Sequence, residues 1–321
     1  MSFIPDNIPY LTKFQEYQKS LPPNFFRAKI FDTLNIICGI VLILYSFVWG
    51  ITAGTEIYGY FAVFIIICLS GYIVYIHHFE KLYRYAICGR YFHTVNHYTR
   101  DFFARLNKNI HENKISANIE DDFDKIIQIN LDTISEFFTL LCRTKCNVCL
   151  KEITQDKTIT TIARDKYSES ERLKYGNGSF IHKLEDNTDF EIAFYGKDSR
   201  WNNCFLCNDL EQLWLKGEYK NSRFLEAEME PKEKNGKVID WPLPYKSCMV
   251  FPVRYYKKNH PHCCIAFLCI DSGRKNVFKF RYQDTIGSAF ADVFYTLITQ
   301  SDTLFKIMKQ RNNSLEMGNS D

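Results

Sequence analysis

Hydrophobic positions near the start of the chain form two long runs instead of a periodic pattern. Residues 33–55 contain no charged side chain, and a second uncharged run, 57–76, follows the single charge of Glu56. A helix needs roughly 20 mostly apolar residues to cross a bilayer, where the backbone must satisfy its own hydrogen bonds. The pattern therefore predicts a hairpin over 31–77, with transmembrane helices at about 33–52 and 57–76.

The charges on either side of the two runs predict how the hairpin is oriented. Basic residues precede the first run and follow the second, whereas the short connecting loop has none. Because basic flanks stay in the cytoplasm, we expect a two-pass protein of the bacterial inner membrane, with both termini cytoplasmic and residues 1–30 as a cytosolic leader. A buried hairpin of a soluble protein is the alternative, but its apolar runs would be shorter and interrupted by polar groups.

A stripe of large apolar side chains follows the second run. Its members recur at steps of three and four residues, the period of a helix: Tyr91, Val95, Tyr98, Phe102 and Leu106. We therefore predict a juxtamembrane linker helix over 78–117. Two interpretations stay open, a helix packed on its own domain and a dimeric stalk that passes motion between that domain and the membrane.

Beyond the linker, the pattern alternates between helical and strand periods. Helices are predicted at 119–141 and 282–307, a short helix or turn at 209–217, a charged loop at 226–237, and strands at 146–153, 158–163, 190–195, 247–256 and 262–270. This order predicts an α+β fold, an antiparallel sheet with helices on one side and loops on the other. The domain is expected over 118–305, followed by a disordered tail at 306–321.

Composition narrows the classes of function. The 40 basic and 37 acidic residues nearly balance, which gives no argument for a nucleic-acid partner. Twelve cysteines in a cytosolic domain are expected to be reduced thiols that pack as small hydrophobes. Two Cys-x-x-Cys pairs invite a zinc site, but Cys146 and Cys149 would point to opposite faces of a strand. We therefore predict no metal and no other cofactor.

Catalytic motifs are absent from the sequence. It contains no nucleophile elbow, phosphate-binding loop or kinase signature. The acidic and imidazole side chains of Asp209, Glu211, Asp271 and His182 are interpreted as ordinary surface or capping groups. We therefore expect a protein that is not an enzyme.

Residues 122–301 resemble the GAF family, a small-molecule sensor fold related to PAS. The resemblance rests on four places: a first helix running into CNVCLK at 146–151, SCMVFPV at 247–253, IAFLCIDS at 265–272, and a closing helix after FRYQD at 280–284. It implies a six-stranded antiparallel sheet, a helical face used for dimerisation, and a loop-covered pocket on the other face. Phe280 and Asp284 keep part of the signature of cyclic-nucleotide-binding members, but Thr285 replaces its glutamate and no Asn-Lys pair stands in the expected place. The motif therefore neither supports nor excludes that ligand.

The implied pocket would lie where loops cover the sheet. Its candidate residues combine aromatic walls with a few polar groups, which suit a planar small molecule: Arg164, Tyr195, Trp201, Phe205, Asp209, Trp241, Tyr245, Arg254 and Asp271. The alternative interpretation is that these side chains only pack the domain.

These features together predict a membrane-anchored GAF-like sensor. It would bind a small ligand, a nucleotide among the candidates, or a protein partner, and couple binding to the hairpin as a homodimer or higher homo-oligomer on the lipid bilayer. Two alternatives stay open. One is a two-span effector that breaches the membrane in nucleotide-triggered anti-phage signalling, and the other is a plain membrane tether and dimerisation scaffold.

Overall fold

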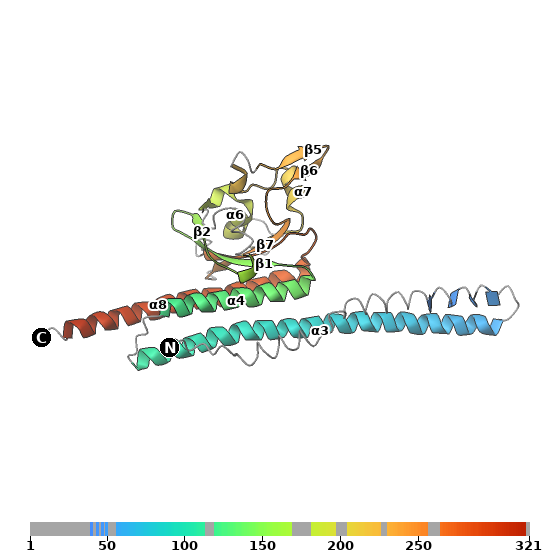
Figure 1. Ribbon diagram of the computed structural model, residues 1–321, viewed down its shortest axis with the longest axis horizontal. Coiled ribbons are helices and arrows are strands. Elements are labelled where there is room, and N and C mark those ends of the chain that lie inside the picture. Colours follow the sequence, from blue (N-terminus) through green and yellow to red (C-terminus); the bar gives the residue numbers. More distant parts are fainter. Residues whose placement is uncertain are drawn as a thin grey trace. The chain divides into compact units, whose positions relative to one another are not determined.

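The computed structural model describes most of the chain beyond residue 55 and a few helical residues before it (Figure 1). The described residues are 39–40, 43–44, 46–47, 49–50, 56–112, 119–168, 181–196, 204–225, 230–255 and 264–318. The chain divides into two units, Met1–Tyr83 and Arg84–Asp321. One long helix, α3 (Glu56–His111), begins in the first unit and ends in the second.

The predicted membrane hairpin falls in the first unit. The leader 1–30 and most of the predicted span at 33–52 lie outside the described residues, whereas the predicted span at 57–76 is part of α3. Within the described part of the chain, no helix combines the length and the hydropathy that crossing a membrane would need. Several apolar side chains of α3 are exposed, among them Phe64, Ile67 and Val74. The hairpin stays a prediction.

The second unit is built on a six-stranded antiparallel sheet. Its strands are β1 (Asn147–Ile153), β2 (Thr158–Arg164), β3 (His182–Lys183), β4 (Phe205–Cys207), β7 (Ser247–Arg254) and β8 (Cys264–Ser272). They lie in the order β3-β2-β1-β8-β7-β4, and each neighbouring pair is antiparallel. The predicted α+β class with an antiparallel sheet is confirmed.

Helices cover the two faces of this sheet unequally (Figure 1). The long helices α4 (Ile119–Cys142) and α8 (Phe280–Gly318) pack along one face, which we call the helical face. The short α6 (Thr188–Tyr195) packs on β4 and β7 from the other side, together with α7 (Leu210–Leu215) and the 3-10 turns η1 (Leu184–Asp186) and η3 (Ser222–Leu225). We call this second side the loop-covered face.

Aromatic side chains form the core on the helical face, and at one point the backbone of α8 lies very close to the sheet. The ring centroid of Phe137 lies 4.9 Å from that of Phe138 and 5.2 Å from that of Phe290. On α8, a Cβ atom added at Gly287 would come within 2.2 Å of the Phe251 ring of β7. Only glycine lets the α8 backbone lie this close to the sheet.

The second half of α3 packs on the helices of the domain. The rings of Phe92 and Phe290 lie 5.3 Å apart, and the amide of Asn130 on α4 donates a hydrogen bond to the Thr99 hydroxyl at 3.1 Å. Of the two interpretations of the linker helix, packing on its own domain therefore describes residues 92–99. The dimeric stalk stays a prediction.

Three segments differ from the elements that the sequence predicted. Residues 190–195 were expected as a strand but belong to α6, where Phe190, Ala193 and Phe194 are buried at helical spacing and Gly196 ends the helix with φ 60°. The expected loop at 226–237 contains the strand β5 (Lys232–Lys234), which forms a hairpin with β6 (Lys237–Asp240). The turn residues Asn235 and Gly236 both have positive φ.

The third difference concerns the end of the chain. α8 continues to Gly318, through most of the segment 306–321 that was expected as a disordered tail. No proline or glycine interrupts the helix between Gly287 and Gly318, and Lys306 pairs with Asp302 one turn earlier at 2.7 Å. A polar helix without breakers gives no apolar periodicity, which is why the pattern missed it.

Candidate ligand-binding site

A buried lysine lies on the loop-covered face. The alternation of β1 places Cys149, Lys151 and Ile153 on this face, and Lys151 is only 7% exposed. Its ammonium group donates a hydrogen bond to Thr161 Oγ1 at 3.2 Å and lies 5.6 Å from the centre of the Phe190 ring of α6. A buried cation is unfavourable unless it is compensated by polar or negative groups, so this position marks a specialised site.

Asp189 supplies one compensating charge. This residue of α6 is 3% exposed, and its carboxylate accepts a hydrogen bond from the Phe190 N–H at 3.0 Å. Burial raises the pKa of Asp189 to about 6, although the Lys151 charge and a hydrogen bond from Tyr219 act in the opposite direction. The carboxylate is therefore close to its titration range at neutral pH.

Three cations act on His182 of β3. The Nδ1 atom of His182 lies 2.5 Å from the Ser222 hydroxyl of η3. Burial, together with the charges of Lys151, Arg223 and Arg164, lowers the pKa of His182 to about 3. The imidazole is therefore neutral at pH 7, and the three cations give this end of the face a positive potential. We call His182 and the three cations the basic cluster.

An aromatic group lies on the same face, nearer to β4. The Tyr219 ring centroid lies 6.3 Å from that of Phe205 and 6.0 Å from that of Phe224, and the Phe224 and Trp241 centroids are 5.5 Å apart. The indole N–H of Trp241 donates to the Tyr245 carbonyl at 2.7 Å. Phe205 and Tyr219 belong to the apolar core of the loop-covered face, and Phe224, Trp241 and Tyr245 pack against it.

Four of the nine predicted pocket residues are thus in these two groups. Phe205, Trp241 and Tyr245 lie in the aromatic group, and Arg164 belongs to the basic cluster. Tyr195 packs against the same core, and its hydroxyl lies 3.1 Å from the ammonium group of Lys157.

The other four predicted residues have separate places. Asp209 caps the N-terminus of α7 and lies 3.0 Å from the ammonium group of Lys275, and Asp271 accepts a hydrogen bond from the Asn147 amide at 3.1 Å. Arg254 ends β7, and Trp201 lies outside the described residues.

Sequence reasoning missed the residues that carry charge into this face. His182 and Glu211 were interpreted as surface or capping groups, yet Glu211 is 7% exposed and His182 is partly buried. Asp271, also 7% exposed, was interpreted in the same way but was named among the pocket candidates too. For Lys151 the sequence did contain a signal, because a lysine at an inward position of an otherwise apolar strand is unusual. Asp189 and Arg223 gave no such signal, because their neighbours are distant in the chain.

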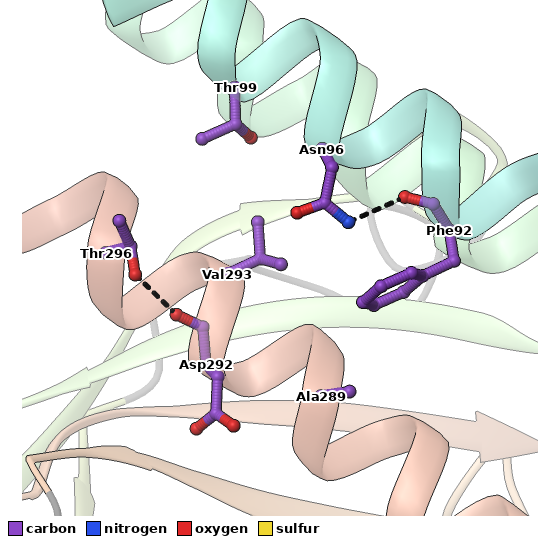
Figure 2. A pocket seen from close by; sticks show the side chains of 7 residues that line it. All are labelled: Phe92, Asn96, Thr99, Ala289, Asp292, Val293 and Thr296. Atoms are coloured by element: carbon purple, nitrogen blue, oxygen red, sulfur yellow. Dashed lines mark hydrogen bonds between the residues drawn. The ribbon is translucent and has the colours of Figure 1, made fainter.

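A groove of about 300 Å³ lies elsewhere, between α3 and α8 (Figure 2). It is lined by Phe92, Asn96 and Thr99 from α3 and by Ala289, Asp292, Val293 and Thr296 from α8. The Asn96 amide and the Thr296 hydroxyl donate to carbonyl groups of their own helices, at 2.9 and 3.0 Å. Asp292 is the one ionisable residue of this lining. The groove therefore offers far less binding chemistry than the loop-covered face.

Comparisons with known proteins give remote structural likenesses. No family model matches the chain, and no curated protein matches it. The GAF domain of a phosphoenolpyruvate-protein phosphotransferase from Coxiella burnetii is 12% identical, with 64% of this chain and 96% of that chain covered and a TM-score of 0.36. The type II free methionine-R-sulfoxide reductase from Thermoplasma acidophilum is 14% identical, with 56% and 96% covered and a TM-score of 0.34. The GAF domain of an Acinetobacter phosphoenolpyruvate-protein phosphotransferase is 9% identical, with 65% and 97% covered and a TM-score of 0.34.

The strand order carries the assignment of the fold. Six antiparallel strands, with two long helices on one face and short elements on the other, are the arrangement that the resemblance implied. The domain is therefore GAF-like in architecture.

Proposed function

We propose that the GAF-like domain is a sensory module that binds a small anionic molecule on its loop-covered face. The observation that supports this proposal is the buried Lys151 together with Arg164 and Arg223 around a neutral His182. Carboxylates and phosphates make strong charge-assisted hydrogen bonds to such groups. The neighbouring aromatic group around Tyr219 suits a planar part of the same ligand.

Strand β1 gives a short route from this site to the helices. Lys151 faces the site, whereas its neighbour Leu150 is fully buried on the opposite side of the strand, and β1 contacts α4. α4 in turn contacts α3 through Asn130 and Thr99. A ligand that moves β1 would therefore act on α3 through one intervening helix.

In this proposal the chain is a non-enzymatic sensor that acts as a homodimer at the inner membrane. Its anchor is the predicted hairpin, which is supported by the uncharged run at 57–76 and by the basic residues on both sides of the hairpin. Cell fractionation tests this part, since recovery of the full-length chain as a detergent-free monomer would contradict it. Leakage of a dye from expressing cells would instead favour the membrane-breaching effector.

Thermal melting of the full-length protein tests the ligand class. The panel contains inorganic phosphate, linear and cyclic mononucleotides and dicarboxylates, with uncharged nucleosides as negative controls. A ligand at a hundredfold excess over its Kd stabilises the native state by about 2.7 kcal/mol. For a domain of this size we expect the melting temperature to rise by about 5–10 °C.

Matched variants separate the basic cluster from general charge effects. Lys151→Met should abolish the shift, whereas Lys234→Met removes the same charge from the exposed strand β5 and should leave it intact. Should Lys151→Met fail to fold, Arg223→Gln replaces it. The proposal fails if no anion raises the melting temperature of the wild type, or if the cluster variant responds as the wild type does.

A further inference from the structure

The loop-covered face contains two pairs of cysteines, and the two members of each pair lie directly opposite each other on neighbouring strands. Cys149 of β1 is the register partner of Cys269 of β8, and Cys207 of β4 is the register partner of Cys248 of β7. Register partners in antiparallel strands have Cα atoms about 4.5–5.5 Å apart, which is within the range that a disulfide bridges. The backbone would let either pair close, so their surroundings decide which pair reacts.

Cationic groups surround the first pair. On its other side Cys149 is the register partner of Arg164, and Lys151 follows two residues later on the same face. A hydrogen bond from Cys269 and the charges of Arg164 and Lys151 lower the pKa of Cys149 to about 6, against the opposing effects of burial and of Asp271. The two cations therefore favour the thiolate form at position 149.

Acidic groups surround the second pair. Cys248 is the register partner of Asp271, and the charges of Asp209 and Asp189 act on Cys207. Burial raises the pKa of Cys207 to about 11, and the two carboxylates act in the same direction. Burial and Asp189 also raise the pKa of Cys248. The second pair thus has the same register geometry as the first, but the charges that act on it are those of carboxylates, whereas Arg164 and Lys151 act on the first pair.

We propose that Cys149 and Cys269 form a reversible redox pair that a small hydroperoxide oxidises to a disulfide. In a reducing cytosol, disulfides are typically transient and redox-sensing. Cys149 and Cys269 are 4% and 7% exposed, so the oxidant has to be as small as hydrogen peroxide. This inference does not depend on the anionic ligand.

The chemistry balances with the peroxide as the oxidant. The Cys149 thiolate attacks one peroxide oxygen, the O–O bond breaks, and the departing hydroxide takes a proton to become water. Cys149 is then a sulfenic acid. The Cys269 sulfur attacks the Cys149 sulfur, the S–O bond breaks, and the leaving hydroxide takes the Cys269 proton as a second water. Two thiols lose two electrons in total, and one peroxide becomes two waters.

Peptide mapping of the full-length wild type tests the proposal. The reduced protein is exposed to hydrogen peroxide, and the remaining thiols are alkylated after denaturation and located by mass spectrometry. We expect a linked peptide that contains Cys149 and Cys269, while Cys207 and Cys248 stay alkylated. From the thiolate fractions at pH 7, the first pair should react at least about a hundredfold faster than the second.

Variants assign the roles within the pair. Cys269→Ser should stop at a sulfenic acid on Cys149, which a diketone reagent traps, and Cys149→Ser should protect Cys269 from oxidation. Arg164→Gln should move the pH midpoint of Cys149 oxidation upward, because it removes a cation that lowers the pKa of this thiol. The ionisable groups that act on this thiol come from three strands: Arg164, Lys151, Cys269 and Asp271.

Three results would overturn the inference. One is a linkage between Cys207 and Cys248, or between Cys142 and Cys146, that forms first. Another is full alkylation of Cys149 after an exposure that oxidises glutathione in the same tube. The third is an unchanged pH midpoint in Arg164→Gln. If the serine variants do not fold, the wild-type map and Arg164→Gln still decide the question.

Discussion

The two faces of the sheet use the same strands for different physical purposes. In β1, Val148 and Leu150 are fully buried on the helical face, whereas Cys149 and Lys151 lie on the loop-covered face. The helical face is filled by the rings of phenylalanines such as Phe137. The loop-covered face buries a lysine, carboxylates and five cysteines among its aromatic residues.

This difference shows which face is optimised for packing and which for chemistry. Buried aromatic side chains gain stability from their area and contacts. Buried ionisable groups such as Lys151 and Asp189 lower stability unless they are compensated, and perturbed pKa values are concentrated at functional sites. The loop-covered face is therefore the place to look for binding, and the helical face the place to look for structural stability.

The largest expected effect is on the helical face. Gly287→Ala would place a Cβ atom 2.2 Å from the Phe251 ring, which is itself fully buried. Because neither backbone nor ring can move freely in a packed core, we expect a loss of about 3 kcal/mol in the free energy of unfolding. Urea denaturation of the full-length protein measures it.

A second glycine provides the control for this substitution. Gly89 in α3 has no atom within 4 Å of an added Cβ. Gly89→Ala should leave stability unchanged or raise it by up to about 1 kcal/mol, because alanine favours helix. Equal losses in the two variants would show that the close approach of α8 to β7 is not the cause.

The second effect tests the electrostatics of the loop-covered face. Since the pKa of Asp189 is raised to about 6 in the native state, the native protein binds more protons than the unfolded chain between about pH 4 and 6. This carboxyl group therefore lowers stability as the pH rises through that window. When the pH is raised from 4 to 7, the free energy of unfolding of Asp189→Asn should therefore increase by about 3 kcal/mol relative to that of the wild type.

Denaturation curves of both proteins at the two pH values measure this change. The titrations of Cys149 and His182 occur in both proteins, so they largely cancel when the variant is compared with the wild type. A difference between variant and wild type that stays constant with pH would mean that Asp189 is not perturbed. That result would remove the contrast between the two faces.

The smallest effect concerns the short helix α7 beside the site. The Asp209 carboxylate accepts the Gln212 N–H at 3.0 Å and caps this helix. Asp209→Ala should lower the free energy of unfolding by about 1 kcal/mol. Asp240→Ala removes an exposed carboxylate from β6 and should change the free energy of unfolding by less than about 0.5 kcal/mol. Thermal melting compares the two, and equal effects would contradict the capping role.

Periodic segments of the sequence were sufficient to predict the main architecture. The steps of three and four in α4 and the apolar segments of β7 and β8 are local properties, and local periodicity fixes which element forms. The resemblance to GAF domains added the strand number and the loop-covered face. Short elements were harder, because the eight residues of α6 fit a strand pattern nearly as well as a helix.

The composition of the site depended on tertiary structure. Lys151, Asp189 and His182 meet because three separate segments fold over one face, and no local pattern encodes their proximity. Burial likewise changes the charge states of Asp189 and Cys149 through desolvation and through neighbours that only the fold supplies. The sequence by itself determined the class of fold, because periodicity is local. Only the tertiary structure decided the electrostatics of the site, because charge interactions depend on distance in space.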